Sequence, residues 1–477
     1  MKRPYLNLLP ASHMRFLLLM ILLFSAHFAN AQCSCRENLD SLSVSVETNY
    51  IAFQKKIDST GGYKSFLDKL KSKADSLTDF DCYRNVLKTY LAYFNDPHLN
   101  LNLVGKGKNI DVIKSYFKDW PSINISRDSI IRYFNLHKLD SLEGIWQSKS
   151  LNTDVAVIRN ANNRYVGIIM KSDSILWNFS QIRMELTRNG NAFDMLYYRK
   201  DHTPLSTTAY LQDNQLIVQR VGSWNKVFPM VDQKGADEGI RFEALGEDAS
   251  VLTINSFLID KKALIDSLIQ VNDDLISHRK YLIIDLRSNG GGHIMSVNSI
   301  LPYLYTKPIL MDGLEVKSSV ENIQIYKEVK NTKGFSADDR EAFDSIIYKL
   351  EQNPNKIVRV AQGGVFTLDS IKPNPLIVAI VTNETTASSA ELFILWARQS
   401  AKVILFGRRT SGALDHTEIG RVRTLPCSVF SFICPMGAGD HSHDPYIDNI
   451  GIEPDIYLNY GTSGWIKSVY DYLKRTH

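Results

Sequence analysis

The spacing of apolar residues predicts a helical region at the start of the chain. Over residues 36–94, apolar side chains recur every three or four positions, as from Leu87 to Phe94, which is typical of amphipathic helices. The turn at 95–97, Asn-Asp-Pro, ends this pattern, and alternating leucines after it predict a strand. His98 therefore stands at a predicted junction between helix, turn and strand.

The pattern changes to short strands between about residues 140 and 235. Apolar runs such as 165–170 and 193–198 are separated by polar turns, which predicts a β-rich module. Large aromatic side chains are frequently buried, so we interpret Trp146, Trp177 and Trp224 in this module as core packing rather than as a ligand-binding cluster.

Beyond about residue 240, strands and helices alternate. The segments 281–284, 376–381 and 403–406 are near-continuous apolar runs, and helical segments lie between them. Unbroken apolar strands that alternate with helices predict a largely parallel sheet covered on both faces. Functional residues of such a sheet belong at the carboxyl ends of its strands.

These changes divide the 477 residues into parts. Several domains are expected because single cores rarely grow beyond about 250–300 residues. We predict an α/β protein with four parts: a signal peptide at 1–31, a mainly helical N-terminal domain at 32–138, a β-rich module at 139–238 and an αβ core at 239–477.

Residues 1–31 have the features of a secretory signal. Basic residues precede the apolar run at 16–24, and Ala-Asn-Ala at 29–31 fits a signal-peptidase site. The run is shorter than the roughly 20 residues that span a bilayer, so cleavage is favoured over a membrane anchor, with lipidation at Cys33 a minor alternative. We expect an exported protein, periplasmic or secreted, with no membrane span after signal removal.

The net charge and the cysteines indicate which classes of partner and of metal site the sequence supports. Removing the three basic residues of the signal lowers the formal net charge from +4 to +1, which gives no electrostatic reason to expect nucleic acid. Among the five cysteines, the visible pairs are Cys33 with Cys35 and Cys427 with Cys434. No histidine lies near them at metal-ligand spacing, so we assign neither a metal nor a cofactor.

A glycine-rich segment follows the strand at 281–284. Residues 285–292 read Asp-Leu-Arg-Ser-Asn-Gly-Gly-Gly, and consecutive glycines allow backbone conformations that expose N–H groups to a ligand. An oxyanion hole at Gly290 and Gly291 is one interpretation. A plain tight turn and a phosphate cradle are the others, although neither the Rossmann nor the Walker spacing is present.

A serine precedes the helical segment at 389–400. Residues 385–391 read Thr-Thr-Ala-Ser-Ser-Ala-Glu, which places Ser388 at a helix N-terminus, where the helix dipole stabilises a developing anion. The N–H of Ser389 can donate to that anion. Ser388 and Glu391 also fit a capping box, which requires no catalysis.

Taken together and in this order, these segments resemble the tail-specific (C-terminal processing) peptidases of family S41. The matching segments are 285–292, 386–391, the Gly-x-x-Thr-x-Gly stretch at 407–412 and Gly-Ile-Glu-Pro-Asp-Ile at 451–456. The resemblance covers roughly residues 240–460. It implies a crotonase/ClpP-like αβ core and a nucleophile at Ser388.

The chain departs from this pattern at one position. Tail-specific members place a lysine base directly after the last glycine of Gly-x-x-Thr-x-Gly, where this chain has Ala413. Tricorn-like members use a histidine from an N-terminal segment instead, and Asp-Pro-His at 96–98 resembles that segment. The resemblance therefore implies that His98 is the base and that a carboxylate, best matched by Asp448, orients it. His416 and His293 are alternative bases.

Two functions follow from this comparison. The preferred one is a serine endopeptidase that cleaves extended or unfolded polypeptides, with Ser388 attacking the carbonyl and the amides of Gly290 or Gly291 and of Ser389 binding the oxyanion. The alternative is a catalytically inactive protein of the same fold that binds peptides or apolar ligands, because the dyad lysine is missing.

Overall fold

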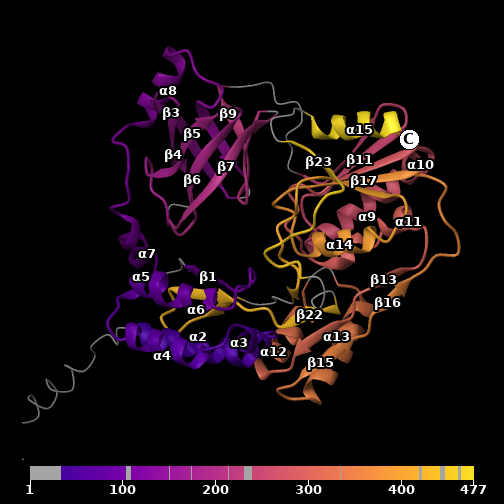
Figure 1. Ribbon diagram of the computed structural model, residues 1–477, viewed down its shortest axis with the longest axis horizontal. Coiled ribbons are helices and arrows are strands. Elements are labelled where there is room, and N and C mark those ends of the chain that lie inside the picture. Colours follow the sequence, from indigo (N-terminus) through magenta and orange to yellow (C-terminus); the bar gives the residue numbers. More distant parts are fainter. Residues whose placement is uncertain are drawn as a thin grey trace, which may run out of the picture.

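The computed structural model in Figure 1 describes most of the chain beyond the expected signal. The described residues are 34–103, 109–149, 151–172, 175–212, 214–229, 239–332, 335–417, 422–440, 446–459 and 464–476. The predicted signal peptide at 1–31 and Cys33 lie outside them. Within the described part, none of the helices combines the length and the apolar run that a bilayer crossing requires.

Short helices form the N-terminal region, as the apolar spacing predicts. A capping box between Ser34 and Glu37 starts the first of them, and Leu39, Leu42 and Val46 line its buried face. The helices and helical turns are α2 (Cys35–Asn49), α3 (Phe53–Thr60), α4 (Tyr63–Ala74), α5 (Asp79–Cys82), the π-helical η1 (Tyr83–Leu87) and α6 (Lys88–Ala92). Two further helices, α7 (Asn109–Phe117) and α8 (Arg127–Leu136), lead to the next part of the chain.

The disulfide pairs suggested by the sequence are wrong. Cys35 pairs with Cys82, which joins α2 to α5, and Cys434 is a free, buried thiol. Cys427 is disulfide-bonded but not to Cys434. Closeness in sequence does not identify the partners, because helix packing brings cysteines that are distant in sequence within bonding range.

The β-rich segment closes into an antiparallel barrel, at the upper left in Figure 1. Its strands are β2 (Gly144–Ser148), β3 (Thr153–Ala161), β4 (Arg164–Lys171), β5 (Ile182–Asn189), β6 (Ala192–Tyr198), β7 (Pro204–Gln212), β8 (Gln215–Val218) and β9 (Gly222–Phe228). Trp146, Trp177 and Trp224 are buried in the same apolar cluster, which confirms that they are packing residues.

A six-stranded sheet forms the αβ core on the right of Figure 1. Its order is β10 (Arg241–Leu245), β11 (Ala249–Thr253), β12 (Tyr281–Asp285), β17 (Ile377–Thr382), β18 (Val403–Gly407) and β23 (Ile456–Tyr457). All neighbours are parallel except β10, which pairs antiparallel with β11. The mixed α/β fold with a largely parallel sheet, predicted from the unbroken apolar runs, is confirmed.

Helices cover both faces of this sheet. Ile283 and Ile284 are consecutive residues of β12 that are fully buried in two different clusters, because side chains along a strand alternate between faces. One face packs against α9 (Lys262–Val271), α10 (Asp273–His278) and α14 (Ser389–Ala397), and the other against α15 (Trp465–Thr476). Short helical turns η2 (Ile259–Lys261), η3 (Ile294–Val297) and α11 (Leu301–Leu304) complete this layer.

Smaller sheets join the core to the N-terminal helices. Strand β1 (Asn100–Leu103) pairs antiparallel with β21 (Phe430–Ile433), so residues more than 300 positions apart in sequence are hydrogen-bonded neighbours. The remaining elements are β13 (Ile309–Met311), β14 (Leu314–Lys317), α12 (Val320–Val329), α13 (Ala337–Glu351), β15 (Ile357–Ala361), β16 (Gly364–Phe366), β19 (His416–Thr417), β20 (Arg423–Thr424) and β22 (Gly437–Gly439). The sequence around His98 is thereby held against the C-terminal part.

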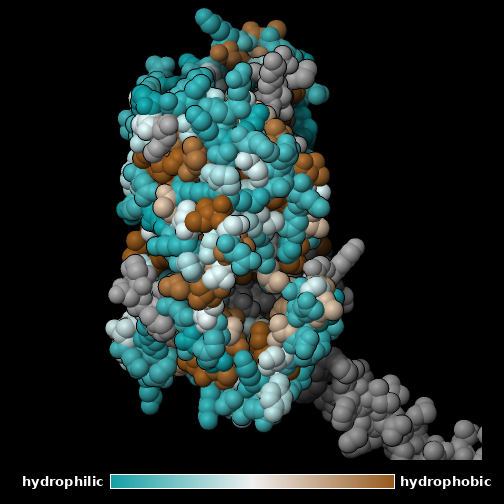
Figure 2. All heavy atoms as spheres, turned by 90° about the vertical axis from the view of Figure 1, so that its right-hand side faces the viewer, coloured by the Kyte–Doolittle hydropathy of each residue, from teal (hydrophilic) through white to brown (hydrophobic). Residues whose placement is uncertain are grey.

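Figure 2 views the molecule from the side of the αβ core. On the coloured part of this face, apolar side chains occur in separate groups among polar ones. Such a mixture is ordinary for a surface in contact with water.

Candidate active site

Loops from neighbouring strands meet at the carboxyl edge of the core sheet. The loop 286–292 follows β12, 383–388 follows β17, and 408–416 follows β18. Because these strands are parallel and adjacent, their carboxyl ends share one edge, where ligand sites of such sheets lie.

Ser388 has an unusual backbone conformation. It directly precedes α14 with φ +58° and ψ −126°, a region that non-glycine residues rarely adopt and that costs about 1–3 kcal/mol. The surrounding contacts must hold it there. The position also puts the serine at the positive end of the α14 dipole.

Glu391 supplies the main contact that holds this turn. Its buried carboxylate accepts hydrogen bonds from the N–H of Ser388 at 3.0 Å, Gly412 at 2.8 Å and Ala413 at 2.9 Å, and from the hydroxyl of Thr410. Burial raises the pKa of Glu391, although these donors oppose the increase. Glu391 thus caps α14 and also ties the serine to the loop after β18, so capping and a reactive serine are compatible.

The glycine-rich loop lies directly against the serine. A Cβ atom on Gly291, where φ is +97°, would approach the Cβ of Ser388 to 2.7 Å and the carbonyl oxygen of Ala387 to 2.8 Å. Asn289 accepts a hydrogen bond from the N–H of Gly291 at 2.9 Å. Only glycine fits at this position while the serine keeps its place.

Gly291, one of the predicted oxyanion donors, already has a partner in this structure. Its N–H is bonded to the side chain of Asn289, which sequence spacing alone does not reveal. The N–H groups of Gly290 and Ser389 form no hydrogen bond with the described part of the chain. These two remain the candidates for an oxyanion hole.

His98 lies in a buried cluster of acids and imidazoles. Its side chain is 8% exposed, and its Nδ1 lies 3.6 Å from Oδ1 of Asp96, which accepts a hydrogen bond from the His98 N–H at 2.8 Å. One potential ligand atom from each of Asp96, His98 and Asp448 falls within 4.8 Å of the others. The predicted base and the predicted orienting carboxylate are therefore neighbours.

His416 lies between the two carboxylates of this cluster. Its Nδ1 is 2.8 Å from Oδ2 of Asp96 and 3.4 Å from Oδ2 of Asp448. Burial alone would lower the pKa of His416, but the carboxylates of Asp448 and Asp96 outweigh it and raise the pKa to about 9. A histidine that is already protonated near neutral pH is a poor general base.

Asp96 is the centre of this cluster. Its side chain is fully buried and also accepts a hydrogen bond from the hydroxyl of Tyr50 at 2.6 Å. Burial opposes the charged form, but the imidazoles of His416 and His98 hold the pKa of Asp96 well below its usual range.

The segment 410–416 connects the serine to the histidine cluster. Gly412 and Ala413 donate to Glu391, and the next two residues, Leu414 and Asp415, donate to Oδ1 of Asp448 at 2.6 and 2.9 Å. Among the described residues, no hydrogen bond or ion pair joins Ser388 to His98 or His416. The site thus has two parts, the serine turn and the histidine cluster, and segment 410–416 contacts the first through its beginning and the second through its end.

His293 belongs to a different environment. It follows the glycine loop, its Nδ1 accepts a weak hydrogen bond from the N–H of Met295 at 3.4 Å, and its ring packs edge-on against Phe335. Burial lowers the pKa of His293, so its neutral form is favoured. No carboxylate forms an ion pair with this ring within the described ranges, whereas Oδ1 of Asp96 lies 3.6 Å from the ring of His98.

Comparison with known proteins identifies the region that carries these loops. Residues 248–458 match the model of the family described as peptidase family S41. This region is an S41 peptidase domain. The resemblance inferred from the motifs is confirmed, and the matched residues include Ser388, Glu391, Asp448 and the glycine loop.

Individual relatives of the chain are distant. It is 21% identical over 213 residues to a protein of Chlamydia trachomatis, covering 38% of this chain and 35% of that one, and 22% identical to an uncharacterized protein of Chlamydia muridarum, covering 37% and 34%. The chain thus spans about a third of the length of these curated relatives.

Solved structures resemble the chain loosely. Mature CPAF matches with a TM-score of 0.48 and 14% identity, covering 89% of this chain and 93% of that one. The photosystem II D1 C-terminal processing protease matches with a TM-score of 0.38 and 11% identity, covering 90% and 94%.

In the S41 domain, Ala413 stands where tail-specific members have the lysine base. The backbone at this position is nevertheless hydrogen-bonded. Its N–H donates to Glu391, so the backbone at this position supports the serine turn. Three residues further along the same segment, His416 contacts Asp96, the neighbour of His98.

Sequence reasoning missed Tyr50, Asp96 and Asp415 as members of this site. Asp415 is buried and accepts hydrogen bonds from the N–H of Ile447 and of Asp448, which fixes the segment that carries Asp448. A signal for Asp96 was present, because an aspartate two residues before a histidine can bond its N–H. Tyr50 is 46 residues from Asp96 and carried no such signal.

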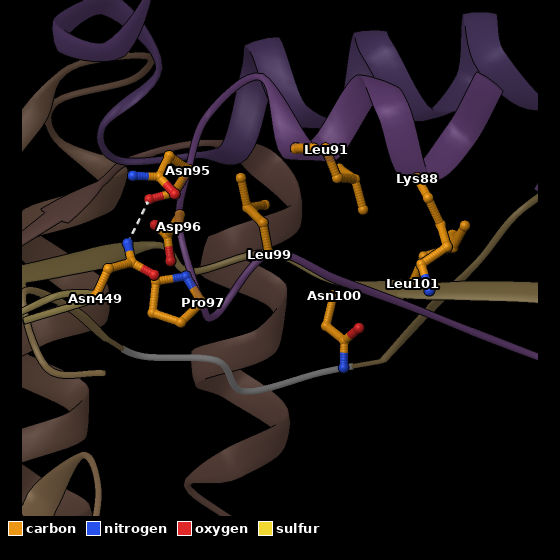
Figure 3. Close-up of a pocket in the computed structure, with 10 residues that line it drawn as sticks. Lys88, Leu91, Asn95, Asp96, Pro97, Leu99, Asn100, Leu101 and Asn449 are labelled. Carbon is orange, nitrogen blue, oxygen red and sulfur yellow. Dashed lines mark hydrogen bonds between the residues drawn. The ribbon is translucent and has the colours of Figure 1, made fainter. Parts of the chain in front are cut away.

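A cavity of about 250 Å³ is lined in part by Asp96. Figure 3 shows Asn95, Asp96, Pro97 and Asn449 at one end of it, with a hydrogen bond of 3.0 Å from the Asn449 side chain to the Asn95 carbonyl. Residues of α6 and β1 form the other end: Lys88, Leu91, Ala92, Leu99, Asn100 and Leu101. The cavity gives small molecules a space next to the cluster.

Proposed function

We propose that the chain is a serine peptidase in which Ser388 is the nucleophile and His98 the general base. The observation that carries this proposal is the strained backbone turn at Ser388, which Glu391 holds by a hydrogen bond and which contacts Gly291. Segment 410–416 connects this turn to a buried histidine that has carboxylates beside it. The S41 match supports a serine-type peptidase.

In the proposed reaction, Nε2 of His98 accepts the proton of the Ser388 hydroxyl as Oγ attacks a peptide carbonyl. The imidazolium that forms is stabilised by Asp96, which lies on its Nδ1 side, and by the nearby Asp448. The protonated imidazole then returns the proton to the leaving amine. Hydrogen bonds of this kind often shorten only when substrate is bound.

The tetrahedral oxyanion requires hydrogen-bond donors that are not already engaged. The N–H groups of Gly290 and Ser389 meet this condition among the described residues, and they lie on the two segments that contact Ser388. Removing one such donor typically costs about 100-fold or more in kcat.

Extended or unfolded polypeptides are the proposed substrates. Strand β1 begins two residues after His98 and is the outer strand of its three-stranded sheet. An extended peptide can add to such an edge through main-chain hydrogen bonds, whereas a folded loop cannot. We propose endopeptidase activity on this basis.

The structure does not favour the alternative of an apolar-ligand carrier. The interior of an eight-stranded barrel is either filled by side chains or holds one small ligand. Here Trp146, Phe193 and Trp224 are fully buried within it. An apolar ligand would have to displace these aromatic rings.

Export is also part of the proposal. The disulfide between Cys35 and Cys82 suits an oxidising compartment such as the periplasm or the exterior. Amino-terminal sequencing of the protein recovered from periplasmic or secreted fractions tests this. A start at residue 32 supports cleavage after the segment 29–31, whereas an intact protein confined to the cytoplasm contradicts it.

The decisive experiment measures cleavage of casein and labelling by a fluorophosphonate. Wild type should be labelled and active, Ser388→Ala should lose both, and His98→Gln should lose at least about 100-fold in kcat, the usual lower range for a general base. His278→Gln is the matched control, because His278 is exposed on α10 and bonds only within its helix. Equal activity of wild type and Ser388→Ala would refute the mechanism.

A further inference from the structure

The cluster around His98 also has the composition of a metal site. Asp96, His98, His416 and Asp448 present two carboxylates and two imidazoles, and their side chains are 0%, 8%, 4% and 5% exposed. Three separate segments contribute them, which is why no metal-ligand spacing is visible in the sequence. Nitrogen and oxygen ligands of these types are the usual ligands of zinc.

One imidazole nitrogen in the cluster lacks a hydrogen-bond partner. Nδ1 of His98 is buried and forms no hydrogen bond with the described residues. Oδ2 of Asp448 is also buried and accepts no well-directed hydrogen bond, although Nδ1 of His416 lies 3.4 Å from it as an ion-pair partner. Buried polar atoms are normally satisfied, so an unpaired group such as Nδ1 of His98 calls for an explanation such as a bound ion.

The separation between His98 and Asp96 suits a metal better than a hydrogen bond. Nδ1 of His98 lies 3.6 Å from Oδ1 of Asp96, and Nδ1 of His416 lies 3.4 Å from Oδ2 of Asp448, which is long for a hydrogen bond. Only the contact of His416 with Oδ2 of Asp96, at 2.8 Å, is a hydrogen-bond distance among these three. Ligands bound to zinc at about 2.0–2.2 Å in tetrahedral geometry lie about 3.3–3.6 Å from one another.

We propose that Asp96, His98 and Asp448 bind a zinc ion that inhibits the peptidase, with His416 as the nearest donor for the fourth position. This inference rests on the proposed function for its inhibitory consequence. The cavity lined by Asp96, Pro97 and Asn449 lies beside this site (Figure 3).

Inhibition follows from the chemistry of the imidazole. Zinc binds a ring nitrogen of the neutral form, and when Nδ1 is bound the remaining proton is on Nε2. A His98 ring that carries its proton on Nε2 cannot accept another from Ser388. Zinc therefore blocks the base rather than assisting the reaction, in contrast to a catalytic metal.

Metal binding is tested without any activity. Purified Ser388→Ala protein, with the disulfides intact and freed of metal by EDTA and dialysis, is titrated with Zn²⁺ by calorimetry and with Co²⁺ by visible absorption. We expect one equivalent to bind, with affinity at least 10-fold lower in Ser388→Ala/His98→Gln and unchanged in Ser388→Ala/His278→Gln. Absence of saturable binding, or equal affinity in both double variants, would overturn the site.

The variant Asp448→Asn distinguishes the loss of a zinc ligand from a failure of the protein to fold. Asparagine keeps the Oδ1 acceptor for the N–H groups of Leu414 and Asp415 but removes the charge at Oδ2, which faces His416. With a circular dichroism spectrum like that of the parent, it should bind Zn²⁺ at least 10-fold more weakly. Unchanged binding in this variant would refute the ligand assignment.

Inhibition is tested separately on the wild type. Zn²⁺ should suppress casein hydrolysis and fluorophosphonate labelling, and EDTA should restore both. If zinc binds through His98 but activity is unaffected, the site stands and its inhibitory role is refuted. If no activity is found even in EDTA, the proposed function fails, while the titrations still decide whether the site exists.

Discussion

Replacing His416 by asparagine should remove a large pH dependence of stability. In the folded protein the carboxylates of Asp448 and Asp96 raise the pKa of His416 to about 9, whereas its ordinary value is 6.5. A raised pKa stabilises the folded state fully below pH 6.5, and this contribution is lost as the pH rises through 9. The side-chain amide of asparagine lies near the position that Nδ1 of His416 occupies in the wild type, but it does not titrate.

The magnitude follows from the two pKa values. The difference between about 9 and 6.5 corresponds to about 3 kcal/mol of unfolding free energy, at about 1.4 kcal/mol for each pKa unit. His416 is 4% exposed, so solvent screening reduces this little. The assay is urea unfolding followed by tryptophan fluorescence between pH 6 and 10, with EDTA present to exclude metal ions.

Wild type should lose about 3 kcal/mol more than His416→Asn between pH 6.5 and 9.5. His202→Asn is the control, because burial lowers the pKa of His202 to about 4 and its effect falls on the acid side. That variant should keep the alkaline slope of the wild type. Parallel curves for wild type and His416→Asn would refute the conclusion that His416 is charged in the folded protein.

Three further predictions concern the serine turn and the disulfide. Gly291→Ala should lower kcat by about 100-fold, because its Cβ would displace Ser388, while a normal thermal unfolding midpoint shows that the fold survives. Glu391→Gln should lower the unfolding free energy by about 1–3 kcal/mol, because the amide cannot accept from every donor that the carboxylate satisfies, and an unchanged urea midpoint would contradict this. Replacing both Cys35 and Cys82 by serine should lower the unfolding free energy by about 4 kcal/mol, because the bridge joins residues 47 positions apart. Urea unfolding of wild type and of the double variant, both without reductant so that the disulfide of Cys427 stays intact, measures this loss, and equal urea midpoints would contradict it.

Local sequence was sufficient for much of the fold. The unbroken apolar run at 281–284 is a buried parallel strand, because a strand covered on both faces has no polar side. The serine at the start of α14 was also predictable, because the order strand, short loop and helix places it at the sheet edge. The glycine loop was found for the same reason, but not the bond that occupies the N–H of Gly291.

The order of chemically distinctive segments along the chain determined the family, the parallel core and the serine that lies at its edge, because these depend on neighbours within a few residues. Only the tertiary structure decided which acids surround His98, why His416 is charged and which cysteines pair. Those properties depend on contacts between segments tens to hundreds of residues apart, such as Asp96 with His416, and burial then amplifies each charge interaction. No pattern within one segment contains that information.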